Sequence, residues 1–121
     1  MLFVVGLLQQ QKELDVLQIS DVHGYINGLL HDKSYGDLAQ VFSYYENLKE
    51  QIGNTTDTRS IYSAMVGDAC DGTGLSDLTV PKCKLIYQAL NEIKMFDAVI
   101  LGNHDGARTE TLEYIRDQDW F

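Results

Sequence analysis

Three strand-like runs that alternate with helix-like segments restrict most strongly what this chain can fold into. Runs rich in aliphatic and β-branched residues predict strands at 14–20, 59–66 and 96–101. Apolar residues that recur every three or four positions predict helices at 38–52, 81–93 and 108–117. Strands alternating with helices indicate an α/β fold, β-α-β-α-β-α, with parallel strands and right-handed crossovers.

Local signals define where these elements begin and end. Asp37 is a suitable start for the first helix and Gly53 a suitable stop, while Pro81 fits the first turn of the second helix. The glycine- and aspartate-rich stretch 67–77 is expected to be a loop. The third strand is almost continuously apolar, which is typical of a sheet covered on both faces.

Length and composition favour a single packed domain. The chain has 121 residues, of which 45% are hydrophobic, so it can form a core. Its net charge of −9 argues against nucleic acid as a partner, because phosphate backbones would be repelled. Cys70 and Cys83 lack the spacing of a structural zinc site, and either a disulfide or two packed thiols would explain them.

The N-terminal residues 1–13 are expected to lie outside the main domain, which would span 14–121. Their apolar start has the character of a signal-peptide core, which would favour secretion or an endomembrane lumen. They lack a basic start and an Ala-x-Ala pattern, so a disordered N-terminus or a first strand in a cytoplasmic protein is the alternative. The apolar run is too short to span a membrane.

A polar cluster follows each predicted strand. Asp21 and His23 follow the first strand, Asp68 the second, and Asn103 and His104 the third. In parallel sheets, ligands bind outside the carboxyl ends of the strands, so these side chains are expected to share one crevice. Carboxylate, imidazole and amide donors suit Zn, Mn, Fe or similar divalent ions rather than copper. Two such ions could hold a phosphoester and activate a water molecule, with Asp68 bridging them.

Each polar motif also has a simpler explanation when it is taken alone. Asp-x-His-Gly and Gly-Asp occur in ordinary surface turns, and Asn-His-Asp can cap its own loop. His31 is expected to be a polar loop residue, and Cys70 a packed side chain. A calcium loop that starts at Asp68 is excluded, because Cys70 and Gly72 would stand where oxygen ligands are needed.

The combination of motifs resembles a known family. The sequences DVHG (21–24), GD (67–68) and GNHD (102–105) resemble the first three signature motifs of the calcineurin-like metallophosphoesterases. GDACDGTGLS (67–76) and FDAVILGNHD (96–105) are similar to the 5′-nucleotidase branch. The resemblance implies that 14–121 is the front half of a metallophosphoesterase sandwich, and so an incomplete domain.

The resemblance also implies roles for individual residues. Two divalent ions (Zn, Mn, Fe, Mg or similar) would cleave a small phosphoester, such as a nucleotide, by in-line attack of water. Asp21 and His23 would bind the first ion, Asp68 would bridge, and Asn103 would bind the second ion. His104 would stabilise the transition state or protonate the leaving oxygen. Asp105 would orient His104 through a hydrogen bond.

Departures from the family pattern limit what is expected of this chain. Asp71 fits the protein-phosphatase motif, but Gly72 and Thr73 replace the Arg-Gly that follows it there. No histidine follows Asp105, so the later histidine motifs and the C-terminal half of the domain are expected to be missing, and activity to be weak or absent. Two alternatives to the enzyme remain open: a non-catalytic remnant with one weak metal site from Asp21, His23 and Asp68, or an unrelated α/β binding module.

Overall fold

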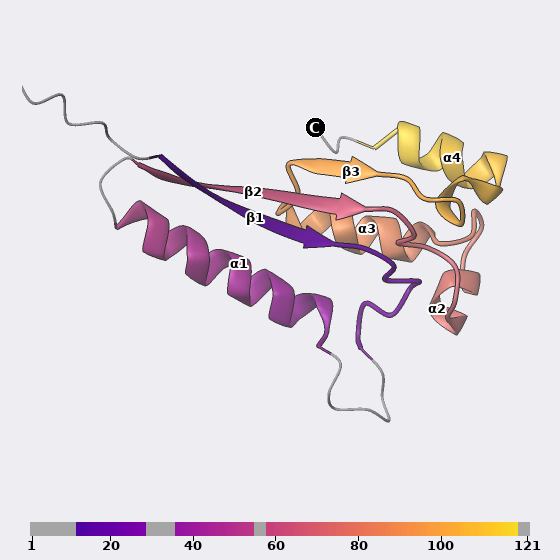
Figure 1. The fold of residues 1–121 in the computed structure, drawn as a ribbon. Coiled ribbons are helices and arrows are strands. Elements are labelled where there is room, and N and C mark those ends of the chain that lie inside the picture. Colours follow the sequence, from indigo (N-terminus) through magenta and orange to yellow (C-terminus); the bar gives the residue numbers. More distant parts are fainter. Residues whose placement is uncertain (1–11, 29–35, 55–57, 119–121) are drawn as a thin grey trace, which may run out of the picture.

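The computed structural model describes residues 12–28, 36–54 and 58–118, in which three parallel strands form one sheet in the order β1-β2-β3 (Figure 1). The strands are β1 (Glu13–Ile19), β2 (Arg59–Val66) and β3 (Ala98–Ile100). The helical elements are α1 (Leu38–Gly53), α2 (Gly74–Asp77), α3 (Lys84–Ile93), the 3₁₀ turn η1 (Asp105–Ala107) and α4 (Thr109–Arg116). The predicted α/β class with parallel strands is confirmed.

One face of the sheet forms the core together with the helices. Met65 of β2 is fully buried and belongs to the same apolar cluster as Leu38 and Tyr45 of α1 and Ile86 and Leu90 of α3. Each of these helices connects two neighbouring parallel strands, and right-handed connections that proceed in one direction place their helices on the same face. The core therefore lies between this face and the pair α1 and α3.

The helix α1 begins where the sequence predicts. The Asp37 carboxylate accepts a hydrogen bond from Gln40 N at 2.7 Å, and the Gln40 side chain accepts one from Asp37 N at 3.4 Å. This reciprocal pair satisfies two N–H groups that the first helical turn leaves without partners. The helix ends at Gly53, and Asn54 caps it by donating its N–H to Glu50 O.

The segment between β2 and α3 differs from the prediction in two ways. Residues 67–77 are not all loop, because Thr73 accepts a hydrogen bond from Ser76 N and starts the short helix α2. Pro81 is not in the first turn of α3. The Val80–Pro81 peptide bond is cis, and the helix begins only at Lys84.

The opposite face of the sheet is open within the described residues. The register pairs Val16 with Tyr62, and both side chains lie on this face, 61% and 42% exposed. Ile100 of β3 is 55% exposed, so the expectation of a third strand covered on both faces is wrong for the described chain. β3 is also shorter than predicted, since only Ala98–Ile100 pair with β2.

Three further expectations concern cysteines, the chain start and membranes. Cys70 and Cys83 form a disulfide, which selects one of the two alternatives left open by the sequence. The interpretations of 1–11 and of His31 fall outside the described residues. Among the described helices, none has the length and apolar character needed to cross a bilayer.

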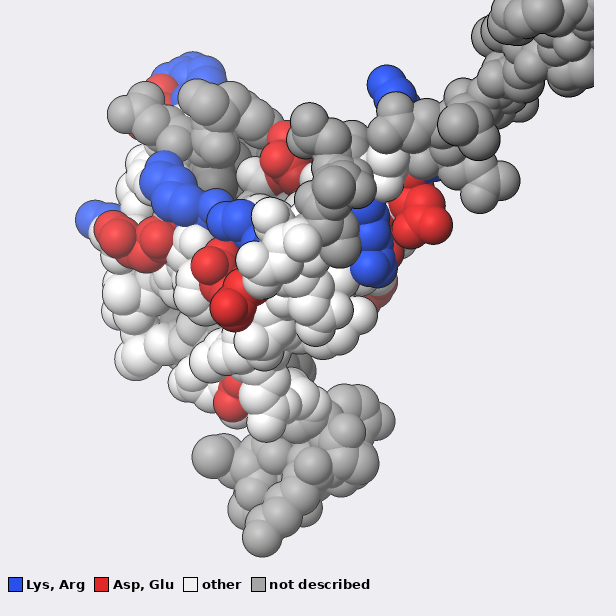
Figure 2. All heavy atoms as spheres, turned by 90° about the vertical axis from the view of Figure 1, so that its left-hand side faces the viewer, with Lys and Arg blue, Asp and Glu red and all other residues white. Residues whose placement is uncertain are grey.

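The amino end of the sheet carries paired charges. Figure 2 views the molecule from this side and shows acidic and basic side chains interspersed among uncharged ones. Here the Arg59 guanidinium donates two hydrogen bonds to the Asp15 carboxylate, at 2.5 and 3.0 Å, and lies 3.9 Å from Glu13. The Arg59 hydrogen bonds hold the pKa of Asp15 below its ordinary value.

Candidate metal centre

The loops after the three strands are joined to one another by backbone hydrogen bonds. Asp21 N donates to Gly67 O at 3.1 Å and His23 N donates to Asp68 O at 2.9 Å, so the loop after β1 continues alongside the loop after β2. Gly67 N donates to Ile100 O at 2.8 Å, which ties in the end of β3. The polar residues after each strand are therefore held on one rigid edge of the sheet.

Backbone conformation and close packing explain the residues of the motifs. Asp21, His23 and Asp68 all have φ near +50°, a left-handed region in which Asp and His are enriched among non-glycine residues. A Cβ atom at Gly102 would overlap the Asp68 carboxylate and lie 2.5 Å from Asp68 N. The loop after β3 can therefore pack this closely against Asp68 in the loop after β2 only with glycine at position 102.

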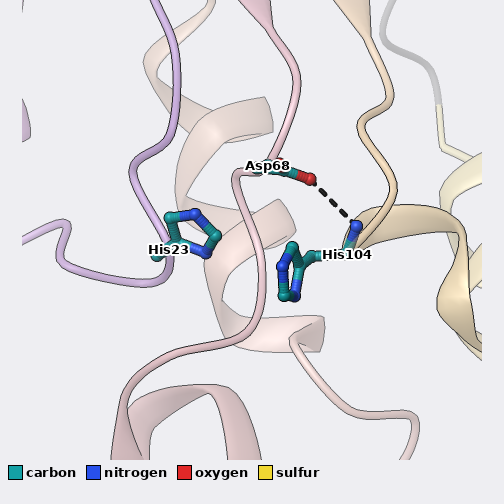
Figure 3. Close-up of side chains that lie close together, drawn as sticks. All are labelled: His23, Asp68 and His104. Carbon is teal, nitrogen blue, oxygen red and sulfur yellow. Dashed lines mark hydrogen bonds between the residues drawn. The ribbon is translucent and has the colours of Figure 1, made fainter.

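Three predicted side chains meet at this edge. One ring nitrogen each of His23 and His104 and a carboxylate oxygen of Asp68 all lie within 4.8 Å of one another. Figure 3 shows the three residues converging from three separate segments, with the Asp68 carboxylate reaching the backbone of His104. That hydrogen bond runs from His104 N to Asp68 Oδ1 at 2.9 Å. The two imidazole rings pack edge to face, with centroids 4.9 Å apart.

The other two predicted metal ligands lie at the margin of this group. The Asp21 carboxylate is 3.9 Å from His23 Nε2, but its side chain is 68% exposed. Asn103 is exposed in the loop that also carries His104. The structure therefore brings His23, Asp68 and His104 together and leaves Asp21 and Asn103 beside them.

Asp71, which the sequence placed in no role, contacts both histidines. Its backbone oxygen lies 2.9 Å from His23 Nδ1, and its Oδ2 lies 3.8 Å from His104 Nδ1. Lys82 Nζ lies 2.5 Å from Asp71 Oδ1 and 2.8 Å from Asp77. The Lys82 ammonium, with a smaller contribution from His104, holds the pKa of the Asp71 carboxyl below its ordinary value.

Asp105 has a different environment from the one expected. It is buried and accepts hydrogen bonds from Gly102 N at 2.8 Å, Cys70 N at 2.9 Å and Ala69 N at 3.4 Å. The hydroxyl of the buried Tyr87 donates to it as well. Burial is the main cause that raises the pKa of the Tyr87 phenol, and the hydrogen bond to the Asp105 carboxylate is the second. Asp105 thus ties the loops after β2 and β3 together, and the carboxylate that faces the His104 ring belongs to Asp71 instead.

Sequence reasoning missed Asp71 and Lys82 for different reasons. Asp71 matches the second motif of the protein phosphatases, but that match does not indicate a contact with the histidines. Lys82 offered no signal, because its place beside Asp71 follows from the Cys70–Cys83 disulfide, which brings the segments after Cys70 and before Cys83 together.

The sequence is similar to a known protein family and to two fungal proteins. A family model for calcineurin-like phosphoesterases matches residues 14–121. The chain is 29% identical over 105 residues to the uncharacterized protein YHR202W of Saccharomyces cerevisiae, covering 84% of this chain and 17% of the relative. It is 26% identical over 94 residues to a protein of Arthroderma benhamiae named "Secreted protein", covering 77% and 14%.

A solved structure shares the fold. The crystal structure of the 5′-nucleotidase from Candida albicans matches with a TM-score of 0.67 at 22% identity, covering 85% of this chain and 19% of that chain. The chain thus spans less than a fifth of the length of these proteins. The three parallel strands and their helices correspond to one part of the larger neighbour.

Proposed function

Because this chain belongs to the calcineurin-like phosphoesterase family, we propose that it forms the metal-binding part of a hydrolase that cleaves small phosphomonoesters, such as nucleotides. The observation that carries this proposal is the convergence of His23, Asp68 and His104 at the carboxyl ends of parallel strands. Membership of the family also sets aside the alternative of an unrelated α/β binding module.

The donor set fits divalent ions. Imidazole and carboxylate groups are ligands for Zn, Mn, Fe or Mg, and the histidines and aspartates of this edge supply both kinds. In the dinuclear arrangement, Asp21 and His23 would hold one ion, Asn103 the other, and Asp68 both. Bound ions would lower the pKa of a water molecule and neutralise charge on the phosphoryl group.

The chain's own residues would position the substrate and move a proton. His104 is 44% exposed at the edge, where its ring can reach a bound ester and protonate the leaving oxygen. Asp71 lies beside that ring and would fix its orientation, since Lys82 favours the ionised carboxylate. Asp105 would act through the backbone, by holding Gly102 and therefore the loop that carries His104.

A pocket beside the site offers room for the leaving group. It has a volume of about 510 Å³, within the range of small-molecule sites, and its wall includes Asp21, Tyr25, Ile26 and Val41. Its apolar and aromatic lining would favour an organic leaving group over inorganic phosphate alone. Asp21 lines this pocket and is also a proposed ligand of one ion.

The test is hydrolysis of p-nitrophenyl phosphate and of AMP in the presence of Zn, Mn, Fe or Mg. We expect turnover when the chain is extended by the downstream part of a relative's domain, and weak or no turnover from the 121 residues alone. His104→Ala in the extended protein should lower kcat by about 10²–10⁴-fold, the usual share of a positioned acid. Unchanged kcat in that variant would exclude the assigned role.

A non-catalytic metal-binding module is the second candidate. The group formed by His23, Asp68 and His104 favours it, since such donors can bind an ion without cleaving an ester. Metal binding by the extended protein without hydrolysis of either substrate would support this candidate over the enzyme.

A further inference from the structure

We propose that the pocket between the loop after β1 and the start of α1 binds a flat, uncharged organic group, and that Tyr25 determines its specificity. Binding in this pocket needs neither a metal ion nor hydrolysis. Only the use of the pocket, to hold the leaving group of a phosphoester, rests on the proposed function.

The pocket adjoins the edge at which the polar loops meet. It has a volume of about 510 Å³, and its wall extends from Asp21, after β1, to Val41 in α1. Figure 1 shows the first turn of α1 beside the segment that follows β1. The Asp21 carboxylate also lies 3.9 Å from Nε2 of His23. One molecule could therefore place a phosphoryl group at the edge and its organic part in the pocket.

Backbone hydrogen bonds hold the walls of the pocket in place. Tyr25 N donates to Val22 O at 2.8 Å, and Gly28 N donates to Tyr25 O at 3.0 Å, so the loop forms two successive turns. Leu38 N donates to Ile26 O at 2.9 Å and fixes this loop to α1. Because the walls are formed before a ligand arrives, little ordering has to be paid on binding.

The side chains of the pocket suit a flat ring. Tyr25 lines the pocket and is 43% exposed, so part of its aromatic ring is accessible to a ligand. Aromatic side chains bind other rings by offset stacking or by edge-to-face contact. The remaining wall is largely apolar and includes Ile19, Val22, Ile26, Leu38 and Val41.

The charges of the pocket select against anionic ligands. Among the described residues that line it, the charged ones are Asp21 and Asp37, and both are acidic. The Asp37 carboxylate accepts a hydrogen bond from Gln40 N, but a carboxylate can accept further donors. An amide or amino N–H on a neutral ring can supply such a donor, whereas an anionic group on the ligand would be repelled. The pocket should therefore distinguish neutral from anionic leaving groups.

The test uses the full 121-residue chain without metal ions and follows its backbone amides by ¹H–¹⁵N NMR. The probes are adenosine and the isosteric pair benzamide and benzoate, which differ in charge. We expect adenosine and benzamide to shift the amides of residues 22–28 and 37–41, and benzoate to bind at least about 10-fold more weakly than benzamide. Tighter binding of adenosine than of benzamide would assign the pocket to nucleosides, and the reverse would assign it to simple aryl groups.

Variants test the roles of individual residues. Tyr25→Leu should weaken adenosine binding by about 5–150-fold, the usual share of one aromatic ring that stacks on a base, whereas Tyr25→Phe should preserve it. Tyr44→Leu is the matched control, because Tyr44 is 60% exposed and belongs to α1 outside the residues that line the pocket. Asp37→Asn, which preserves the helix cap, should bring the affinities for benzoate and benzamide closer together.

The proposal would be overturned if neither neutral probe shifted residues 22–28 and 37–41, or if benzoate bound as tightly as benzamide. Equal losses in Tyr25→Leu and Tyr44→Leu would exclude Tyr25 as the determinant, and circular dichroism of both variants checks that they are folded. The benzamide and benzoate comparison uses the unmodified chain, so it holds even if a variant does not fold. Failure of the hydrolase proposal would appear as absent turnover and would leave these binding results unaffected.

Discussion

Aspartates at the two ends of the sheet lie in different surroundings. At the amino end, Arg59 pairs with Asp15 through two hydrogen bonds, and Asp97 accepts bonds from the backbone and hydroxyl of Ser63. At the carboxyl end, Asp68 is met by a backbone N–H and two imidazoles, none of which has a permanent charge. A carboxylate already paired with guanidinium has little left to offer a metal ion, so the surroundings of an acid, rather than its presence, mark the candidate site.

The backbone differs between the ends as well. Among the described residues, five non-glycine residues in the connections at the carboxyl end have φ between +48° and +69°, against one, Lys94, at the amino end; the five are Asp21, His23, Asp68, Asp71 and Cys83. A non-glycine residue held in this region costs on the order of 1–3 kcal/mol and persists only where its surroundings hold it. The hydrogen bonds of the buried Asp105 to the loops after β2 and β3 are part of this support.

The largest effect is therefore expected from Asp105→Ala. Three backbone N–H groups and the Tyr87 hydroxyl would lose their acceptor in a largely buried region, and each unsatisfied buried donor costs about 1–3 kcal/mol. We expect the free energy of unfolding, measured by urea denaturation, to fall by about 3–5 kcal/mol.

The matched control for this prediction lies at the amino end. Asp97→Ala removes the acceptor of a single backbone N–H, that of the buried Ser63, whose hydroxyl keeps its bond to Met95 O, so the loss should be about 1–3 kcal/mol and smaller than that of Asp105→Ala. If both variants lose the same stability, the two ends are supported equally and the comparison fails.

Gly102→Ala should have the next largest effect. The added Cβ would overlap the Asp68 carboxylate, and overpacking of this kind costs about 1–3 kcal/mol. The displacement of Asp68 should also weaken Zn²⁺ binding in calorimetry. Gly53→Ala is the control, because a Cβ there meets nothing within 4 Å. Unchanged metal affinity in Gly102→Ala would show that Asp68 is not a ligand.

Much of the fold could be predicted because its signals are local. The strands β1 and β2 and the helix α1 lie within one residue of the predicted bounds, since each is determined by a run of residues and its own caps. The convergence of His23, Asp68 and His104 could be predicted too, because parallel strands deliver their ends to one edge.

The remainder depended on contacts between distant residues. The family resemblance implies a hydrogen bond between Asp105 and His104, whereas in the structure the buried Asp105, in η1, accepts a hydrogen bond from the Tyr87 hydroxyl. Asp71 and Lys82 are 11 residues apart, and the disulfide that brings their segments together could not be told from two free thiols by sequence alone.

The smallest effect is expected from Arg59→Met, which removes the main cation of the amino end. Arg59 lowers the pKa of Asp15, so the pair stabilises the fold above the ordinary value of 3.8, and this contribution disappears as pH falls through the lowered pKa. The unmodified and variant chains should therefore differ slightly in urea midpoint at pH 7, and this difference should shrink as pH falls below about 3.8 and vanish below the lowered pKa of Asp15.

The same variant tests whether the two ends are independent. Arg59 bonds to residues at the amino end of β1, whereas His23, Asp68 and His104 follow the carboxyl ends of the strands, so Zn²⁺ affinity should not change. Strands held by a continuous ladder could transmit a shift along β1, and a fall in affinity as large as that of Gly102→Ala would reveal it. The metal site would then depend on the whole sheet, and the Arg59–Asp15 pair at the amino end could not be treated as independent of Asp68 at the carboxyl end.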